Sequence, residues 1–465
     1  MNLRTKANLA IAAFMCACLF PAVGMLLLPE GQATANQRLA PVPTLTTADG
    51  KINLEVFQQA TDYIADHFAF RQQMITANAA LNAALFHVST EDSVLLGKEG
   101  WLFYQQTAAD YLHTEPLSQR QLYGAAHTIA LMQEYLTARG IRLFVTVAPN
   151  KASLYPEYLP DIGQPLDRQA DIDRLTPLLA EEGIAYVDLF AALRSQRTQD
   201  DTALHEFLYH RLDSHWNARG AALAHDTLMS ALGKTDQTLF FPGDYVFCQN
   251  HKGDLYEMLY PAGKELDENV QYQREPVFSY SSNFHSVEDQ YIETQNPLKS
   301  GSLFMFRDSF GNALYPFLAD AYGHCIFSRA MPYQLSLLDA CDADTIIIEI
   351  VERNLDWLAT RAPIFPAPLR ILSQMPPIGQ AEAAFSITDD GMLEGYLQLT
   401  GTLSGKVDAH SPIYIQLDDM LYEASPAGQG EIPFTAYVPR AVYQQATVLY
   451  FADGILYQTP YQAVA

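Results

Sequence analysis

The residue best suited to nucleophilic chemistry is Ser309, in the segment FMFRDSFGNAL. An apolar run ends just before Arg307 and Asp308, and a helical pattern follows. The serine therefore lies where a buried strand gives way to a helix, and the unpaired N–H groups at a helix N-terminus can stabilise a nearby oxyanion. A serine at that place can also simply cap the helix, so its position alone leaves both roles open.

A second segment, YHRLDSHWNARGA, supplies the groups that a serine nucleophile needs. The serine requires a base to take its proton, and the base requires an acceptor that fixes its tautomer. In an extended segment, residues two apart share a face, so Asp213 and His215 can act as orienter and base for Ser309. The structural alternative is that Asp213 or Ser214 caps the next helix while His215 packs beside Trp216.

The same segment also offers the side chains of a metal site. His205, His210, Asp213 and His215 lie close together in the sequence and could ligate zinc. The five-residue spacing of the histidines, however, points successive side chains in different directions around a helix, and no His-Glu-x-x-His motif is present. We therefore predict no metal.

The elements that position these residues alternate between strand and helix. This pattern predicts an α/β fold, a parallel sheet flanked by helices in three layers, with sites at the carboxyl ends of the strands. The predicted strands are 141–148, 184–189, 302–306 and 345–351, and the predicted helical segments are 54–86, 117–139, 167–182, 217–232 and 310–321.

Weaker candidates follow other strands. Asn150 and Lys151 end the strand 141–148 and could donate to an oxyanion or bind substrate, or only form a turn. Arg329 follows a short strand and could pair with the carboxylate of a sugar acid, or with a surface acid. Asp308 is expected to position the turn, and Glu349, inside a buried strand, needs an arginine or a backbone N–H as partner.

The rest of the sequence predicts an N-terminal anchor, a linker and the domain boundaries. Residues 1–28 read as a transmembrane anchor, because Arg4 and Lys6 precede an uncharged run long enough for a bilayer core of about 30 Å. The catalytic part would then lie outside the cytoplasm. The alternative is secretion after signal cleavage near Ala35. The other predicted parts are a linker over 29–50, an α/β domain over 51–375 with a hairpin at 93–104 and a β-rich insertion over about 234–300, and an all-β sandwich-like domain over 380–465.

Composition excludes some partners. Hydrophobic residues make up 49% of the 465 residues, which suffices for a core, and the net charge of −25 argues against nucleic acid as a partner. Only Cys248, Cys325 and Cys341 follow the N-terminal apolar run, so one disulfide at most can form there.

Five segments in order carry a family resemblance: GKEGWLFY, VAPNKASLYPEYLP, YHRLDSHWNARGA, FRDSFGNALYPFL and EIVERNL. Over about residues 97–358 the chain resembles the SGNH hydrolase-like family of the alginate O-acetyltransferases AlgJ and AlgX and the related bacterial DHHW proteins. The resemblance implies a triad of Asp213, His215 and Ser309, with Tyr315 at the family's tyrosine position. The C-terminal β region resembles the carbohydrate-binding module of AlgX in position and β character only.

The resemblance implies an extracytoplasmic O-acetyltransferase or acetylesterase that modifies a cell-surface or exopolysaccharide glycan through an acetyl-serine. It implies no bound cofactor, because a membrane-bound O-acyltransferase partner would relay acetyl from acetyl-CoA. The alternative from another class is a non-catalytic glycan-binding or polysaccharide-assembly protein on the same scaffold.

Overall fold

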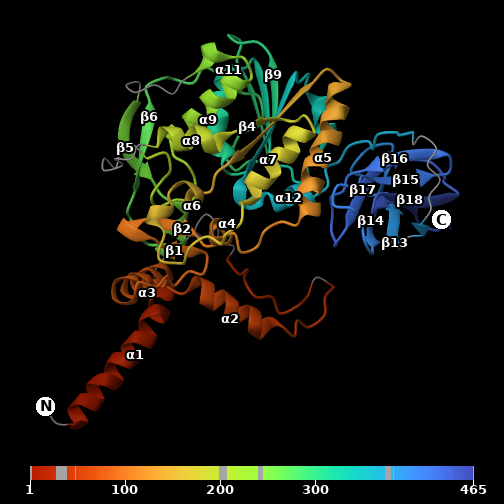
Figure 1. Cartoon of the computed structure of the whole chain (residues 1–465). Helices are drawn as coiled ribbons and strands as arrows, with labels where there is room; N and C mark the ends of the chain where they lie inside the picture. The colour runs from red at the N-terminus through yellow and green to blue at the C-terminus, as the bar shows by residue number, and fades with distance from the viewer. Residues whose placement is uncertain are drawn as a thin grey trace. The chain divides into compact units, whose positions relative to one another are not determined.

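The structure is a computed structural model (Figure 1) that describes residues 3–27, 39–47, 49–197, 207–238, 245–371, 379–380 and 382–463. The chain forms two compact units. The first comprises residues 1–105, 211–214 and 250–267, and the second comprises 106–210, 215–249 and 268–465.

The first unit is mainly helical. Its elements are α1 (Leu3–Leu27), α2 (Val56–His67), α3 (Arg71–Phe86), β1 (Val94–Leu96), β2 (Leu102–Tyr104) and α10 (Asp254–Leu259). The helical segment predicted over 54–86 is two helices, because Phe70 has a left-handed backbone (φ 66°) that cannot continue a right-handed helix. The predicted hairpin is confirmed, since β1 and β2 pair antiparallel.

The predicted membrane anchor is not supported. Within the part of the chain that the structure describes, no helix combines the length and the apolarity needed to cross a bilayer. Residues 29–38 and 48 of the predicted linker over 29–50 lie outside the described residues.

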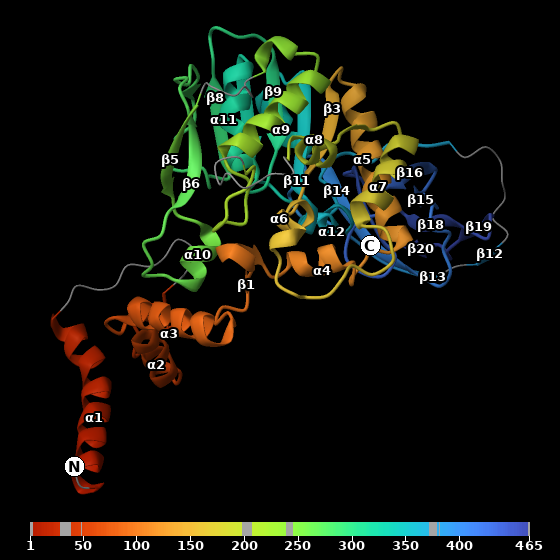
Figure 2. The same ribbon diagram turned by 60° about the vertical axis from the view of Figure 1, so that its left-hand side comes forward.

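The second unit is built on a seven-stranded sheet (Figure 2). In order across the sheet, the strands are β4 (Ala185–Val187), β3 (Arg142–Ala148), β11 (Thr345–Val351), β9 (Ser302–Phe306), β10 (His324–Ser328), β8 (Tyr291–Gln295) and β7 (Ser279–Tyr280). The first five are parallel, and β8 and β7 add an antiparallel edge. The four predicted strands are confirmed, whereas β10 and the antiparallel edge were not predicted as part of this sheet.

Two sets of helices flank this sheet. One set is α5 (Gln119–Thr137), α7 (Asp171–Glu181) and α12 (Asp356–Thr360), and the other is α8 (Leu189–Gln196), α9 (Ala218–Ala231) and α11 (Gly311–Ala321). Ile346, Ile348 and Ile350 of β11 share a core with the first set, so the alternate residues of the strand face the opposite side. The predicted three-layer α/β fold is therefore confirmed.

Short elements of both units complete the described part of the chain before the C-terminal strands. The remaining helices are α4 (Thr107–Leu112) and α6 (Lys151–Leu154), with 3-10 turns at Lys98–Gly100, Pro156–Tyr158, Thr235–Gln237, Leu335–Ala340 and Glu352–Asn354. The segment predicted as a β-rich insertion contains β5 (Tyr245–His251), β6 (Asp267–Tyr272), β7 and β8. Cys325 and Cys341 are thiols that form no disulfide.

The C-terminal strands form two sheets that enclose one core. The first contains β13 (Glu382–Thr388), β14 (Tyr396–Ser404) and β17 (Pro433–Pro439), and the second contains β12 (Gly379–Gln380), β15 (Ile413–Leu417), β16 (Met420–Ala424), β18 (Gln445–Ala452), β19 (Ile455–Gln458) and β20 (Gln462–Ala463). Leu399 and Val438 from the first sheet are buried together with Ile415 and Val448 from the second. Two sheets around a shared core are a β-sandwich, as predicted.

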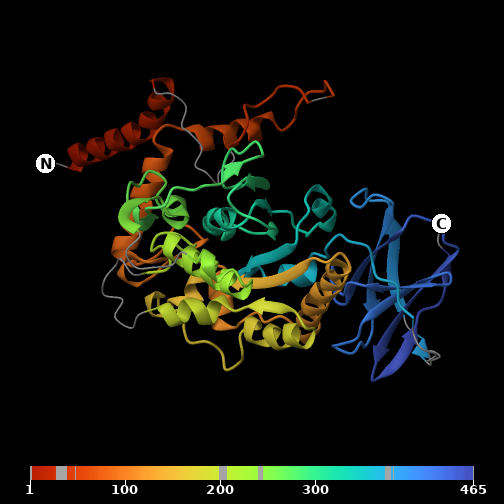
Figure 3. The same cartoon turned by 90° about the horizontal axis from the view of Figure 1, so that it is seen from above.

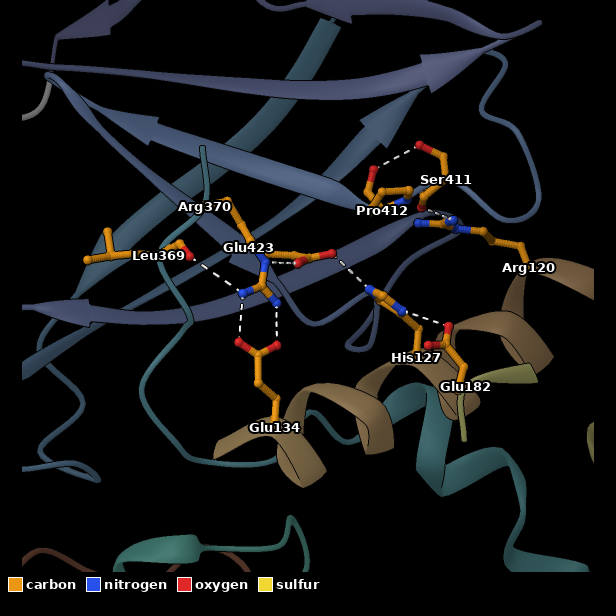
Figure 4. Close-up of polar contacts among 9 residues, drawn as sticks. All are labelled: Arg120, His127, Glu134, Glu182, Leu369, Arg370, Ser411, Pro412 and Glu423. Atoms are coloured by element: carbon orange, nitrogen blue, oxygen red, sulfur yellow. Dashed lines mark hydrogen bonds and ion pairs between the residues drawn. The ribbon is translucent and has the colours of Figure 1, made fainter. Parts of the chain in front are cut away.

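The sandwich docks on α5, and the two lie side by side in Figures 1 and 3. Charged side chains make much of the contact (Figure 4). Glu134 accepts two hydrogen bonds from Arg370, at 2.7 and 2.5 Å, and Arg370 also binds Glu423. His127 lies between two carboxylates, with Nε2 2.9 Å from Glu423 and Nδ1 2.9 Å from Glu182.

The docking face follows the geometry of α5. Arg120, His127 and Glu134 are seven residues apart, which places them along one side of the helix. Arg120 donates to backbone carbonyls of the sandwich, including that of Ser411. At Gly124 a Cβ atom would lie 2.4 Å from the carbonyl oxygen of Pro426, so the helix and the sandwich approach closely there because position 124 carries no side chain.

The docking contact is expected to weaken at high pH. Burial lowers the pKa of His127, but the hydrogen bonds that the ring donates to Glu182 and Glu423 outweigh burial and raise this pKa to about 9. Because the unfolded value is about 6.5, the stabilisation is complete below pH 6.5 and is lost as pH rises through 9. This contribution of His127 to the free energy of unfolding is of the order of 3 kcal/mol. We expect the free energy of unfolding, measured by urea titration, to fall over this range.

The matched comparison is His127→Gln, which keeps a polar side chain and cannot titrate. The difference in unfolding free energy between the wild type and this variant should shrink from pH 6.5 to pH 10. A difference that stays constant over this range would show that His127 is uncharged in the folded protein.

Candidate active site

Ser309 lies in the turn between β9 and α11 and is half-buried. Its hydroxyl oxygen is 2.8 Å from Nε2 of His215. The hydroxyl does not cap the helix, because the N-cap position is Phe310 and no side chain caps it. Asp308 instead accepts a hydrogen bond from the backbone N–H of Phe310, at 2.9 Å. The helix-cap alternative for Ser309 is therefore wrong.

His215 is held by its neighbours in the segment before α9. An antiparallel bridge joins Tyr209 to Trp216, and the indole N–H of Trp216 donates to the carbonyl oxygen of Phe310 at 3.0 Å. Phe310 also packs against the His215 ring, with the ring centres 4.9 Å apart. These contacts join the histidine segment directly to the serine turn.

The start of α9 corrects one sequence prediction. Asn217 is the N-cap residue, and its side chain accepts hydrogen bonds from the backbone N–H groups of Arg219 and Gly220. The alternative that Asp213 or Ser214 caps this helix is wrong.

The Ser309–His215 pair can generate a nucleophile. A separation of 2.8 Å between Oγ and Nε2 is within the range for transfer of the hydroxyl proton to a base. When Nε2 is unprotonated, the Ser309 hydroxyl donates to it. The pair lies after the carboxyl end of β9, the edge where parallel α/β sheets form their sites.

Asp213 precedes His215 by two residues but belongs to the first compact unit. There it is buried, and its Oδ2 accepts a hydrogen bond from the backbone N–H of Asp254 and lies 2.9 Å from Nε2 of His251. Burial lowers the pKa of His251, but the hydrogen bond to Asp213 outweighs this and the pKa is raised. The sequence analysis did not identify His251, and no local motif marks it. The orienting role of Asp213 stays a prediction.

Asn150 and Lys151 are buried and engaged at the carboxyl end of β3. The Asn150 amide donates to Asp110 at 2.8 Å, and its backbone N–H donates to Glu352 at 2.8 Å. Burial raises the pKa of Asp110 to about 6 and that of Glu352 to about 7. Lys151 Nζ donates to the carbonyl oxygen of His210 at 3.0 Å, so it supports the segment that carries His215.

Tyr315 and Arg329 also form polar contacts with other side chains. Tyr315 is 1% exposed, and its hydroxyl is 2.9 Å from that of Tyr280 on β7. Burial, followed by this hydrogen bond, raises the pKa of Tyr315 above its ordinary value. Arg329 forms an ion pair with Glu288, which corresponds to the surface ion pair considered as its alternative role. The substrate-binding roles of these residues stay predictions.

The metal alternative rests on four residues of the histidine-rich segment. Nδ1 of His210 lies 3.1 Å from the carbonyl oxygen of Glu268, and the absence of a metal stays a prediction. His205 lies outside the described residues.

A three-layer α/β fold with a serine–histidine pair at the carboxyl edge of its sheet fits the SGNH hydrolase-like class, among other α/β hydrolase folds. Residues 94–298 match the family described as "SGNH hydrolase-like domain, acetyltransferase AlgX". Ser309 lies just beyond the matched residues. Residues 94–298 are thus similar to the family of AlgX and AlgJ, in agreement with the resemblance of the sequence motifs.

Individual relatives agree with this assignment. A protein described as "Probable alginate O-acetylase AlgJ" from Pseudomonas aeruginosa is 30% identical over 39% of this chain and 44% of its own length. Its counterpart from Pseudomonas syringae is 27% identical over 43% of this chain and 49% of its own length. The chain therefore spans about half the length of the curated relatives that it matches.

Solved structures are more distant. The O-acetyltransferase domain of Pseudomonas putida AlgJ shares 18% identity at a TM-score of 0.38, with 57% of this chain and 92% of that chain covered. Pseudomonas aeruginosa AlgX shares 13% identity at a TM-score of 0.36, with 74% of this chain and 85% of that chain covered.

The hydrogen bond from Trp216 to Phe310 is expected to fix the distance between base and nucleophile. Trp216→Phe keeps a buried ring but removes the indole donor. We expect a loss of about 1 kcal/mol in the free energy of unfolding and a larger effect on catalysis, about 10-fold or more in kcat, because small displacements of reacting groups are costly.

Tyr443→Phe is the matched control. Its hydroxyl donates to the carbonyl oxygen of Pro439 in the sandwich, so the variant also loses one bond from a side chain to a carbonyl. It should lose similar stability with unchanged kcat. Equal kcat for the wild type and the Trp216 variant would show that the indole bond plays no part in positioning the pair.

Proposed function

We propose that the protein is an extracytoplasmic O-acetyltransferase or acetylesterase that acts on a polysaccharide. The observation that carries this proposal is the 2.8 Å contact between Ser309 and His215 at the carboxyl end of β9. Similarity of residues 94–298 to the AlgX family, and of part of the chain to AlgJ proteins, supports acyl transfer as the chemistry and a glycan as the substrate.

The reaction would proceed through an acetyl-serine. The oxygen of Ser309 attacks the carbonyl carbon of the acetyl donor while Nε2 of His215 takes the hydroxyl proton, and this proton then passes to the leaving group. In the second half, His215 removes a proton from a glycan hydroxyl, whose oxygen attacks the acetyl-serine, and the protonated His215 returns this proton to the departing oxygen of Ser309. Water in place of the glycan gives hydrolysis. Asp213 would orient His215 and stabilise its protonated form.

The acetyl donor would come from a partner. A membrane-bound O-acyltransferase would take acetyl from cytoplasmic acetyl-CoA and deliver it to this enzyme outside the cell, in line with the family resemblance. The chain itself would then need no cofactor, because acetyl transfer requires only the nucleophile and the base.

A cavity of about 530 Å³ suits part of a polysaccharide acceptor. It lies between the sandwich and segments that follow β10 and α12, and neither Ser309 nor His215 lines it. Arg361 and the hydroxyls of Thr400 and Thr402 line it, together with Gly401 and Phe434. Hydroxyl groups and one guanidinium beside an aromatic ring match the hydrogen-bonding and apolar faces of an acidic sugar.

The nucleophile prediction has a direct test. Ser309→Ala should abolish hydrolysis of p-nitrophenyl acetate and the acetyl-serine adduct seen by mass spectrometry, with a loss of about 10⁴-fold or more. Ser195→Ala, which changes an exposed serine of α8, should leave both unchanged. If the wild type and Ser309→Ala behave alike and no adduct forms, the non-catalytic glycan-binding alternative gains the support.

The cavity prediction separates binding from chemistry. Arg361→Ala should weaken the use of an acidic polysaccharide such as alginate, with KM raised about 10-fold or more by loss of one charged hydrogen bond. Hydrolysis of p-nitrophenyl acetate should not change, because neither Ser309 nor His215 lines this cavity. A parallel loss with both substrates would contradict a role in acceptor binding.

A further inference from the structure

The turn that carries Ser309 is fixed from both neighbouring strands. β9 lies between β10 and β11, and its pairing with β11 ends where Phe306 faces Ile348. One residue later, the backbone N–H of Arg307 donates to the carbonyl oxygen of Ser328 at the end of β10, at 2.9 Å. The backbone is therefore tied to β10 directly before the turn.

The side chain of Asp308 connects the turn of Ser309 to β11, the neighbouring strand on the other side of β9. Its Oδ1 accepts from the N–H of Phe310 at 2.9 Å, and its Oδ2 accepts from the N–H of Val351 at 2.8 Å and from the side chain of Asn354 at 3.3 Å. Three N–H groups therefore donate to this carboxylate. One side chain thus joins the residue after Ser309 to the end of β11.

Glu349 lies beside Asp308, and its carboxyl group is buried with few hydrogen-bond partners. It is 1% exposed, and its Oε2 accepts from the backbone N–H of Asp308 at 3.1 Å. Its Oε1 is buried without a hydrogen-bond partner, and no ion pair within the described parts of the chain includes it. An ionised carboxylate here would be poorly solvated and would repel Asp308.

The charged and titratable groups around Glu349 do not compensate for such a charge. Arg307 is near, but it donates to Asn312 and to the carbonyl oxygens of Val287 and Asp289 instead. Two buried phenols, Tyr333 and Tyr209, interact electrostatically with this carboxyl, and burial raises the pKa of both well above the ordinary value. Both phenols are therefore neutral.

We propose that Glu349 is a positioning residue that acts as a neutral acid, whose proton lets Asp308 remain ionised against it and hold the turn of Ser309 in place. The proposal rests on the proposed function of Ser309 as the nucleophile. Burial, and next the charge of Asp308, raise the pKa of Glu349 well above the usual range of a glutamate. Loss of this proton at high pH would place two carboxylates side by side and loosen the turn.

Two substitutions of Glu349 distinguish the effect of its proton from the effect of its side-chain shape. Glu349→Gln keeps a neutral group that can both donate and accept, whereas Glu349→Leu keeps the approximate volume and can do neither. We expect the Gln variant to retain kcat/KM for p-nitrophenyl acetate within about threefold at pH 7, and the Leu variant to lose about 100-fold, since a displaced nucleophile is costly. The activity of the wild type should fall at high pH as Glu349 loses its proton, and this fall should be absent from the pH profile of the Gln variant.

Hydrogen exchange of the peptides that cover 307–312 and 349–354 provides a readout independent of activity. Protection of the N–H groups that donate to Asp308 should fall about tenfold in the Leu variant and in the wild type at high pH, but not in the Gln variant. Glu352→Gln is the matched control, because Glu352 is a buried acid that binds Asn150 and Ser153 instead. It should leave the exchange of residues 307–312 unchanged.

The outcomes distinguish the two proposals. If the Gln variant loses activity and protection as the Leu variant does, Glu349 is needed as a carboxylate and the inference is overturned. The wild type could form no acetyl-serine while the exchange protection of residues 307–312 still responds to pH as described. In that case the proposed function fails, but the positioning role of neutral Glu349 is supported. If the wild type and the Gln variant have the same pH dependence in both measurements, the proton of Glu349 has no positioning role.

Discussion

The parallel pairing of β9 with both β10 and β11 is the constraint on which the candidate site depends. β9 has five residues, and its partners continue beside it to the same edge of the sheet. Since a strand in the middle of a sheet cannot shift without breaking two ladders, the end of β9 is one of the most firmly placed points of the unit. Ser309 lies in the turn directly after it, and His215 reaches the serine through contacts with the same turn.

The α/β core could be predicted because its strands are continuous apolar runs. TIIIEIV is buried at every position, and a fully buried strand of this kind has the same appearance in the sequence as in the structure. The strand β10 was harder to recognise, because HCIFS is short and a histidine opens it. β7 and β8 pair antiparallel at the edge, where side chains are partly exposed and the apolar pattern is weaker.

The Ser309–His215 pair was within reach of the sequence because each residue stands at a recognisable boundary of a strand or helix. The supporting contacts were not, since they join residues that are distant in the chain and carry no motif. Capping illustrates this limit: Asp308, Ser309, Asp213 and Ser214 are all suitable cap residues by type, yet Asn217 caps α9 and Asp308 takes the first N–H before α11. Backbone geometry decides between equivalent side chains. His251 and Glu349 acquire their roles only from what surrounds them after folding.

The close approach at Gly124 has an evolutionary consequence. A side chain at this position would press on a backbone carbonyl of the sandwich, and a carbonyl in a packed turn cannot rotate away as a side chain can. Divergence at position 124 is therefore coupled to the presence of a module some three hundred residues further along the chain. In a relative without the sandwich, this constraint disappears and any good helix former would suit the position. The loss or gain of the module during evolution would thus change the residues allowed at one position of α5 in the α/β fold.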